Sequence, residues 1–317
     1  MIDGANSISL TNTALSGTVE GFKLWKTAPT SGAATVTING GSLTATAGDG
    51  IYVTGTTGNA ANGSITVKGG ATISASSGRI LYVDSASTAS FTANGVNLTG
   101  NLIADSTSTI TVSLISSTTL TGSLNRAAMT IDSTSTWDVS ASSVLSSLAN
   151  SGMVAFNSPS LADTISGACT QASTGELTIL LGGASSYDQL AVTGAANLGG
   201  ILDVELANGF VPTVGETFQI ITRGSGSGTF SSITTSSAGI AYSVQYNPAY
   251  VQLTVTAVPE PAAGSLIVAA LMALGLFRHR RGWFGGVPIS PRQRPFPYRT
   301  TGASTGEHVP PGFHGIF

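Results

Sequence analysis

The chain has 317 residues, of which 9% are charged and 41% are hydrophobic. Charged residues make up about a quarter of an ordinary soluble domain, and the high hydrophobic fraction excludes the composition of a disordered chain. Residues 1–257 carry six Lys and Arg against thirteen Asp and Glu. An acidic body of this kind excludes nucleic acid as a partner, because phosphate binding needs a cationic face.

Cysteine and histidine are too scarce for most catalytic chemistry. The single cysteine, Cys169, cannot form an internal disulfide, and we expect it to be a buried, unreactive thiol. The three histidines all follow residue 257: His279, His308 and His314. The body therefore has no histidine for a Ser-His-Asp triad, a Cys-His pair or a metal site. We predict no catalytic residue, no cofactor and no metal.

The first residues, MIDGANSISLTNTALSG, lack the positive start and the continuous apolar run of a signal peptide. Because the C-terminal features below require export, we expect an export signal outside the sequence given. Ser, Thr, Gly and Ala dominate here and in the residues that follow. Such a composition favours strands and turns over helices, since short hydroxyl side chains compete for backbone hydrogen bonds.

Two segments near the N-terminus repeat one another. ATVTINGGSLTATAGDGIYV (34–53) matches GSITVKGGATISASSGRILYV (63–83) in its alternating strands, its Gly-Gly turn and its final apolar triplet. A looser third copy occupies residues 89–106, and later strands follow at closer spacing. Short strands with a period of a few tens of residues predict a parallel β-solenoid, in which each coil stacks on the one before. A β-sandwich is the alternative.

Alternation within these strands predicts which side chains face inward. We expect them to form one continuous apolar column inside the stacked coils: Val36, Ile38, Ile65, Val67, Ile110, Val112 and Leu114. Outward Ser and Thr are predicted to form ladders that face water. Low charge fits this arrangement, because like charges stacked in successive coils would repel. Residues 1–186 are therefore predicted to be the solenoid.

Longer and more apolar strands are predicted after residue 187, at 188–193, 200–206 and 216–222. Residues 240–257 alternate cleanly on both sides of Asn247-Pro248, which predicts a hairpin. We predict that residues 187–257 form an antiparallel β cap that covers the open edge of the solenoid.

Four motifs in this region carry a family resemblance. They are Tyr-Asp-Gln-Leu-x-Val-x-Gly (187–194), Leu-Gly-Gly-x-Leu-Asp-Val (198–204), Gly-Phe-x-Pro-x-x-Gly-Glu-x-Phe-x-Ile-Ile (209–221) and Gly-x-Phe (228–230). Together they resemble the C-terminal passenger region of bacterial autotransporter-type proteins. Residues 95–156 similarly resemble the pertactin-like part of such passengers. The resemblance implies a right-handed β-helix at a bacterial surface, and it implies no reaction.

Residues 258–281, VPEPAAGSLIVAALMALGLFRHRR, have the layout of a membrane anchor. Residues 262–277 carry no charge and, as one helix, would span about 24 Å, slightly less than the ~30 Å hydrocarbon core. Three arginines follow and would hold that end on the cytoplasmic side: Arg278, Arg280 and Arg281. The preceding tripeptide is predicted to be extended and accessible, because proline flanks glutamate on both sides: Pro259, Glu260 and Pro261.

This order of Pro-Glu-Pro, apolar helix and arginines resembles the PEP-CTERM sorting signal. The resemblance implies an exosortase, a membrane enzyme of Gram-negative bacteria, as the partner that recognises residues 259–261. It makes the three arginines the stop-transfer cluster, and it implies inner-membrane transit followed by delivery to the cell surface or extracellular matrix. A plain tail anchor is the alternative. Residues 282–317 show no strand or helix period and are predicted to be disordered.

Taken together, these features predict an exported, non-enzymatic, adhesin-like surface or matrix protein that meets exopolysaccharide or other glycans through repeated hydroxyls. One alternative is a polysaccharide lyase or hydrolase on the same scaffold, for which Asp84, Lys68 and Arg79 are the candidates. The carboxylates are too dispersed for calcium, which takes six to eight oxygens. Another alternative is an autotransporter without its barrel. Trp25 and Trp137 are expected in core or edge packing rather than stacked on a sugar.

Overall fold

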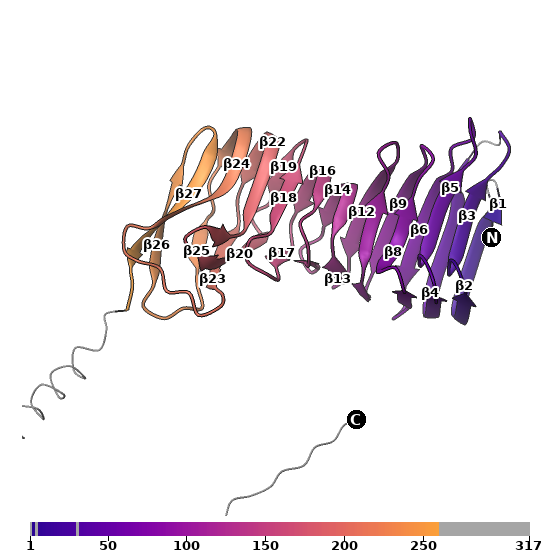
Figure 1. Cartoon of the computed structure of the whole chain (residues 1–317), viewed down its shortest axis with the longest axis horizontal. Helices are drawn as coiled ribbons and strands as arrows, with labels where there is room; N and C mark the ends of the chain where they lie inside the picture. The colour runs from indigo at the N-terminus through magenta and orange to yellow at the C-terminus, as the bar shows by residue number, and fades with distance from the viewer. Residues whose placement is uncertain (1, 4–5, 30–31, 260–317) are drawn as a thin grey trace, which may run out of the picture. The chain divides into compact units, whose positions relative to one another are not determined.

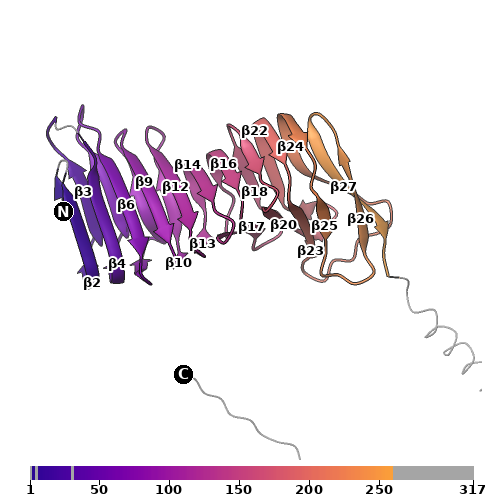
Figure 2. The ribbon, with the colours of Figure 1, turned by 180° about the vertical axis from the view of Figure 1, so that it is seen from behind.

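The computed structural model describes residues 2–3, 6–29 and 32–259. Within these residues, all of the regular secondary structure is β-strand. Strands from successive turns of the chain pair in parallel, so the chain winds into a row of stacked coils (Figure 1). The row runs from β1–β4 to β26 and β27, and Figure 2 shows the same order from behind. These stacked parallel strands confirm the predicted all-β, β-helix-like class.

Each coil passes through three columns of paired strands, which we number in the order that the chain visits them. Column 1 contains β1 (Ile2–Asp3), β3 (Phe22–Lys26), β5 (Ile51–Gly55), β8 (Arg79–Val83), β11 (Asn101–Ala104) and β18 (Ala162–Ile165). Column 2 contains β6 (Asn62–Lys68), β9 (Thr88–Asn94), β12 (Thr109–Ile115) and β19 (Cys169–Gln171). Column 3 contains β7 (Thr72–Ala75), β10 (Asn97–Thr99), β13 (Thr119–Gly122), β15 (Thr136–Val139), β17 (Met153–Phe156), β20 (Glu176–Gly183), β23 (Ile201–Leu206) and β25 (Ser232–Thr234).

The remaining long strands each serve two columns. Near the N-terminus, strands bend from column 2 into column 3: β2 (Ser7–Gly17) and β4 (Ala34–Ala45). Further along, strands bend from column 1 into column 2: β14 (Leu124–Ile131), β16 (Val144–Asn150), β22 (Gln189–Leu198) and β24 (Thr217–Gly228).

The parallel register places the same position of every coil in one ladder. The inward ladder of column 2 is apolar throughout: Val36, Ile65, Phe91, Val112, Met129, Leu148, Cys169 and Ala196. Its side chains are at most 4% exposed, and the seven predicted inward residues are at most 2% exposed, which confirms that prediction. Burial of each large aliphatic side chain stabilises the fold by about 1.5–3 kcal/mol.

Coil length changes along the row. Val36 and its partner Ile65 are 29 residues apart, Val112 and Met129 are 17 apart, and Ala196 and Gly226 are 30 apart. Figures 1 and 2 show the strands shortening in the middle of the row. The predicted period of 29 to 30 residues therefore describes the first repeat and the last coil, while tight turns replace corner loops in between.

Two-glycine corners join columns 2 and 3 in the first coils. Gly40 and Gly41 have φ values of 70° and 78°, a left-handed conformation that glycine adopts at little cost. A Cβ on Gly41 would lie 2.2 Å from the carbonyl oxygen of Thr13 in the preceding coil. The preceding coil therefore excludes a side chain at Gly41, whereas the space at Gly70 is open. Both Gly-Gly pairs share a positive φ, which explains the repeated glycines.

An Asp-Ser-Thr-Ser turn that occurs twice in the chain fastens its coil to the one before. Three side-chain oxygens of the turn 132–135 accept hydrogen bonds of 2.7–3.1 Å from consecutive backbone N–H groups: Asp132 from Ser116, Thr134 from Ser117 and Ser135 from Thr118. The turn 105–108 binds the N–H groups of residues 85–87 in the same way. The strained left-handed turn of one coil, with φ near 60° at Ser116 and Ser117, is thus held by side chains of the next.

Parallel stacking continues beyond residue 187. β22 and β24 extend columns 1 and 2, and β23 and β25 extend column 3. Apart from an isolated bridge at Thr56 and Asn59, antiparallel pairing in the described chain joins β20 to β21 (Ser186–Tyr187) and β24 to β27 (Tyr250–Ala257), with β26 (Ala241–Tyr246) on β27. The predicted hairpin at Asn247-Pro248 is confirmed. Most of the region predicted as a cap is therefore further solenoid, because its strands keep register with the preceding coil.

Arg223 fastens the hairpin to the last coil. It points inward from β24 and is 8% exposed. Its guanidinium donates to the Asn247 carbonyl at 2.8 and 3.2 Å and to the Ala196 carbonyl at 3.3 Å. These carbonyl oxygens satisfy a buried cation, so Arg223 holds the hairpin tip against the solenoid.

We expect Asp132→Ala to lower the free energy of unfolding at pH 7 by about 1–2 kcal/mol, because it removes the acceptor for two backbone N–H groups. Hydrogen bonds from Ser116, Ser135 and Thr134 outweigh burial and hold the pKa of Asp132 below its ordinary value. The difference between the two proteins should therefore shrink as the pH falls through that lowered pKa. Urea unfolding across pH measures it, with Glu205→Ala as the control; equal losses in both variants would contradict the coil-fastening role.

Candidate functional site

The outward side of column 2 is a surface of Ser and Thr side chains, which we call the hydroxyl face. It consists of two rows of in-register residues. The first row contains Ser7, Thr35, Ser64, Ser90, Thr111, Ala128 and Ser147. The second row contains Ser9, Thr37, Thr66, Thr92, Ser113, Thr130, Ala149, Thr170, Asn197 and Ser227. The predicted outward ladders are therefore present.

The rows form a regular lattice of hydroxyl groups. Neighbours within a row lie on adjacent strands, about 4.8 Å apart, and the two rows are separated by two residues of extended chain, about 6.6 Å. Neither row contains an acidic or basic residue. Lys68 lies beside them, two residues after Thr66 on β6.

Hydroxyls on this face have almost no partner within the protein. For the described residues, the one hydrogen bond recorded from a side chain of either row joins Ser227 Oγ to Asn197 Oδ1 at 2.9 Å. Hydroxyls at the corners differ, since Ser87 and Ser108 are buried and accept backbone N–H bonds from the preceding coil. The hydroxyl face therefore keeps its donors and acceptors for water or a ligand.

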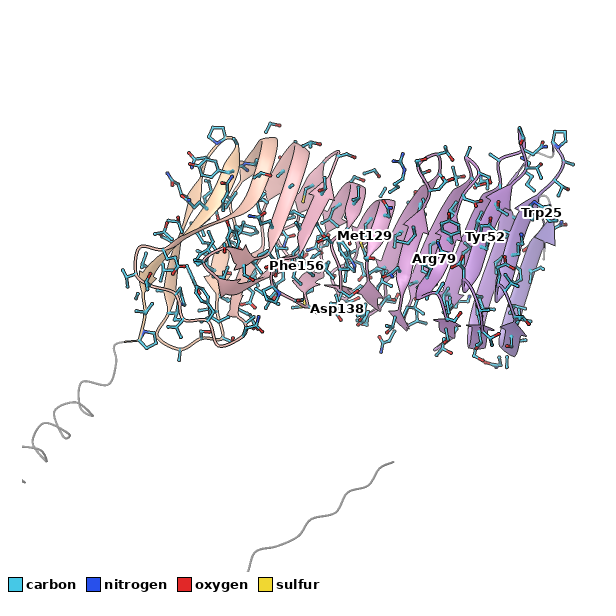
Figure 3. All side chains as sticks on the ribbon, in the orientation of Figure 1. Trp25, Tyr52, Arg79, Met129, Asp138 and Phe156 are labelled. Atoms are coloured by element: carbon cyan, nitrogen blue, oxygen red, sulfur yellow. The ribbon has the colours of Figure 1, made fainter. Side chains whose placement is uncertain are left out.

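The outward side of column 1 carries a cluster of aromatic and cationic side chains, which we call the aromatic cluster: Lys23 and Trp25 on β3, Tyr52 on β5, and Arg79 and Tyr82 on β8. The two tyrosine rings stack with their centroids 5.6 Å apart. Lys23 Nζ lies 4.8 Å from the Tyr52 ring centroid and 5.1 Å from that of Trp25. Arg79 Cζ lies 4.1 Å from the Tyr82 centroid. Figure 3 places Trp25, Tyr52 and Arg79 in successive coils near the N-terminal end.

Hydrogen bonds fix this cluster further. Arg79 binds Asp49 through two contacts of 2.7 and 3.0 Å, and the Tyr52 hydroxyl donates to Asp84 Oδ2 at 2.7 Å. Burial and the Asp84 carboxylate raise the pKa of Tyr52 to about 12. Lys23 lies over the Tyr52 ring, Arg79 lies over the Tyr82 ring and the two rings stack on each other, so the tyrosine faces are engaged within the protein. The aromatic cluster therefore joins coils rather than forming an open binding platform.

The two tryptophans lie where packing was expected. Trp137 is fully buried, and its indole N–H donates to the Gly122 carbonyl at 3.0 Å. Trp25 is half-buried on the outward side of β3, at the edge of the aromatic cluster.

The candidates for polysaccharide cleavage do not form a site. Arg79 binds Asp49 and Asp84 binds Tyr52, whereas Lys68 faces outward from a different column. Cys169 is 3% exposed, and burial raises its pKa to about 12, so the thiol is unreactive at neutral pH. Within residues 2–3, 6–29 and 32–259, no group of three or more His, Cys, Asp and Glu could hold a metal ion.

The predicted sorting signal falls at the end of the described chain. Pro259 is the last described residue and follows β27. The rest of the signal lies outside the described residues: Glu260, Pro261, residues 262–277, Arg278, Arg280 and Arg281, and so does the tail 282–317. Over the part that is described, no helix has the length and apolar character needed to cross a membrane.

A pair of buried carboxylates was not predicted. Asp188 is fully buried and accepts hydrogen bonds from the backbone N–H groups of Leu161 and Leu180, both at 2.9 Å. Asp163 is 1% exposed; its Oδ1 accepts from the Ser143 N–H at 2.7 Å, while its Oδ2 has no partner. Burial raises the pKa of Asp188 to about 6. Burial and the charge of Asp188 raise the pKa of Asp163 to about 7.

Sequence signals exist for some of the residues that were missed. Asp188 is the aspartate of the Tyr-Asp-Gln-Leu motif. The motif marks the position, and the structure shows that the side chain binds backbone N–H groups there. The turns 105–108 and 132–135 have the identical sequence Asp-Ser-Thr-Ser, a local repeat that marks equivalent corners. Asp163 and Asp49 have no such signal, because their partners Ser143 and Arg79 come from other coils.

Two comparisons of this chain were made, with protein-family models and with curated proteins. No protein-family model matches it, and no curated protein matches it. The resemblances to the PEP-CTERM signal and to autotransporter passengers therefore remain predictions from the sequence.

We expect Asp163→Asn to stabilise the protein at pH 8 by about 2–4 kcal/mol, since each unit of raised pKa corresponds to about 1.36 kcal/mol. The pKa of Asp163 lies above its ordinary value, so the wild-type stability is full below about pH 4 and is lost as the pH rises through about 7. The amide removes this loss. Thermal or urea unfolding from pH 4 to 8 measures the effect, and a variant with an unchanged pH profile would show that the carboxylate is not buried as described.

Proposed function

We propose that this chain is an exported, non-enzymatic protein of a bacterial surface or extracellular matrix, built as an adhesin-like right-handed β-helix. The observation that carries this proposal is the hydroxyl face, a continuous set of unpartnered hydroxyls repeated on coil after coil. Such repetition suits many weak contacts with a repetitive partner. The right-handed sense follows the strong preference of crossovers between parallel strands.

The acidic residues support a structural rather than a catalytic reading. Asp49 binds Arg79, Asp84 binds Tyr52, and Asp132 fastens a turn. The buried pair Asp163 and Asp188 binds backbone N–H groups. Each of these carboxylates has a partner that explains its place without a substrate, which disfavours a lyase or hydrolase on this scaffold.

Sorting by an exosortase is the second part of the proposal. The sequence carries Pro259, Glu260 and Pro261 directly after the last strand, followed by the apolar residues 262–277 and by Arg278, Arg280 and Arg281. Pro259 is exposed, and prolines on both sides of Glu260 favour an extended backbone, which is the form that a membrane-bound processing enzyme could bind. We infer cleavage near the tripeptide and release of the body to the surface or the matrix.

Glu260→Ala tests the sorting proposal. We expect the variant, supplied with an N-terminal export signal in a Gram-negative host that has an exosortase, to stay at full length in the membrane fraction. The wild-type protein should be shortened and recovered from the cell surface or the medium. Immunoblots of the fractions measure this, with Glu205→Ala as the control and a host without exosortase as the reference. Equal processing of Glu260→Ala and the wild type would contradict the proposal.

A depolymerisation assay tests the non-enzymatic part. We expect the purified full chain to release no reducing ends and no unsaturated products from neutral or anionic polysaccharides, with or without calcium. Clear turnover that survives further purification would establish the lyase or hydrolase alternative instead.

A further inference from the structure

We propose that the hydroxyl face is the binding surface for an uncharged polysaccharide chain, which lies along the row of coils. This inference rests on the proposed function for its setting at a surface or in a matrix. It adds which face binds, which chemistry the ligand has and how the ligand is oriented.

Charge selects an uncharged ligand. Neither row of the hydroxyl face contains an acidic or basic residue. Lys68 lies beside the second row, but the rows supply no series of cations for an anionic polysaccharide and no carboxylates for a cationic one. The other faces differ. Column 1 carries the aromatic cluster with Lys23 and Arg79, and column 3 carries Asp138, Glu176 and Asp203 on outward positions.

Free hydroxyls select a ligand that is itself rich in hydroxyls. Each Ser or Thr side chain can donate one hydrogen bond and accept two, and in the two rows these capacities are almost unused within the protein. Hydroxyls on column 3 are partly engaged, since Thr121 donates to Asp138 at 3.2 Å and Thr234 to Asp203 at 2.6 Å. Methyl groups of Thr37, Thr66 and Thr92 add apolar contacts beside the hydroxyls.

Geometry selects a chain that runs parallel to the row. The strands of a row follow one another at about 4.8 Å, and most of them carry a hydroxyl; the exceptions are Ala128, Ala149 and Asn197. An extended chain of linked pyranose rings advances by about one such spacing per ring. The second row extends from Ser9 to Ser227 through ten paired strands, or roughly 43 Å at that spacing. A polysaccharide along this line would meet a hydroxyl at most rings, with Ala149 and Asn197 as the exceptions.

A corner pocket beside the face is also uncharged, although its Thr56, Ser85 and Thr107 hydroxyls are already hydrogen-bonded within the protein. Its volume is about 490 Å³, and it lies where the chain turns from column 1 into column 2. Its lining is uncharged and includes four hydroxyl residues: Thr56, Thr57, Ser85 and Thr107. A side branch or a chain end of the same neutral polymer fits this lining without a change of ligand class.

The face is preorganised for weak but additive contacts. Ser and Thr have short side chains, so little rotamer freedom is lost when a ligand binds. Successive sites lie on one paired sheet and engage as a set, which predicts an affinity that rises with ligand length.

Affinity electrophoresis of the full chain tests the proposal, with hydroxyethyl cellulose as the neutral probe and alginate as the anionic probe. Calorimetry with β-1,4-linked glucose oligomers from the disaccharide to the octasaccharide measures the length dependence. We expect retardation by hydroxyethyl cellulose, none by alginate, and affinity that increases with each added ring.

Substitution on the face separates it from the rest of the surface. We expect the triple variant Thr37→Val, Thr66→Val and Thr92→Val to bind about tenfold more weakly or worse, because three hydrogen-bonding groups are lost. The matched control, on outward positions of column 3, is Thr44→Val, Thr119→Val and Thr136→Val, which removes the same number of hydroxyls and should bind like the wild type. Thr66→Lys with Thr92→Lys is a second, more soluble variant and should also lose binding. Thermal unfolding verifies that all variants fold.

Three results would overturn the inference. The first is equal loss of binding in the column 2 and column 3 variants, and the second is binding to alginate alone. The third is no binding to any neutral glycan together with inhibition of ice growth, which would mean that the face orders water instead. Failure of the proposed function is distinguishable, because processing of the Glu260 variant is read from cell fractions and does not depend on glycan binding.

Discussion

Parallel strands in register hold successive coils about 4.8 Å apart, and the rest of the structure depends on that spacing. Each position meets the same position of the next coil, so inward residues form ladders such as Ile65, Phe91 and Val112. A side chain at Gly41 would enter the backbone of the preceding coil. Like charges would meet their own kind at this distance, which accounts for outward rows made of Ser and Thr.

Hydroxyl groups have two distinct uses in this fold. At the corners, Ser87, Ser108 and Ser135 accept backbone N–H bonds from the preceding coil and are buried. They replace hydrogen bonds that the backbone cannot make where a strand ends. On the hydroxyl face the same residue types are half-buried or exposed and, apart from Ser227, make no hydrogen bond within the described protein. Corner hydroxyls therefore stabilise the stack, and those of the face are left for whatever the protein meets.

The repeat in the sequence predicted the part of the fold that local patterns determine. Alternation assigned Val36, Ile38, Ile65 and Val67 to the interior, and the Gly-Gly pairs marked the corners, all of which the structure confirms. In the sequence, the shorter coils in the middle of the row appear only as predicted strands that follow one another at closer intervals. The boundary predicted at residue 187 is not a break in the stacking, because the strands that follow keep parallel register with the preceding coil. Their greater length is what suggested a separate cap.

Features that depend on contacts between neighbouring coils, and so between residues 20 to 30 apart in the chain, escaped the sequence. The ion pair of Arg79 with Asp49 and the hydrogen bond of Asp163 with Ser143 join residues about one coil apart, and neither partner carries a motif. The outward ladders were predicted. Predicting that their hydroxyls have no partner within the protein would have required the position of every neighbouring donor and acceptor. The sequence therefore predicted that an outward surface of Ser and Thr exists. It could not predict which of those hydroxyls lack a hydrogen-bond partner within the protein.

Disulfide trapping of the register tests the central claim most directly. In a Cys169→Ala background, Thr66→Cys with Thr92→Cys joins in-register partners on neighbouring coils, within the Cα separation of about 4.4–6.8 Å that a disulfide needs. Thr66→Cys with Ser90→Cys is the diagonal control, at about 8 Å from the strand geometry. The account predicts rapid oxidation of the first pair alone, detected by thiol alkylation and mass spectrometry. Preferential bonding of the diagonal pair would contradict the register and with it the hydroxyl face.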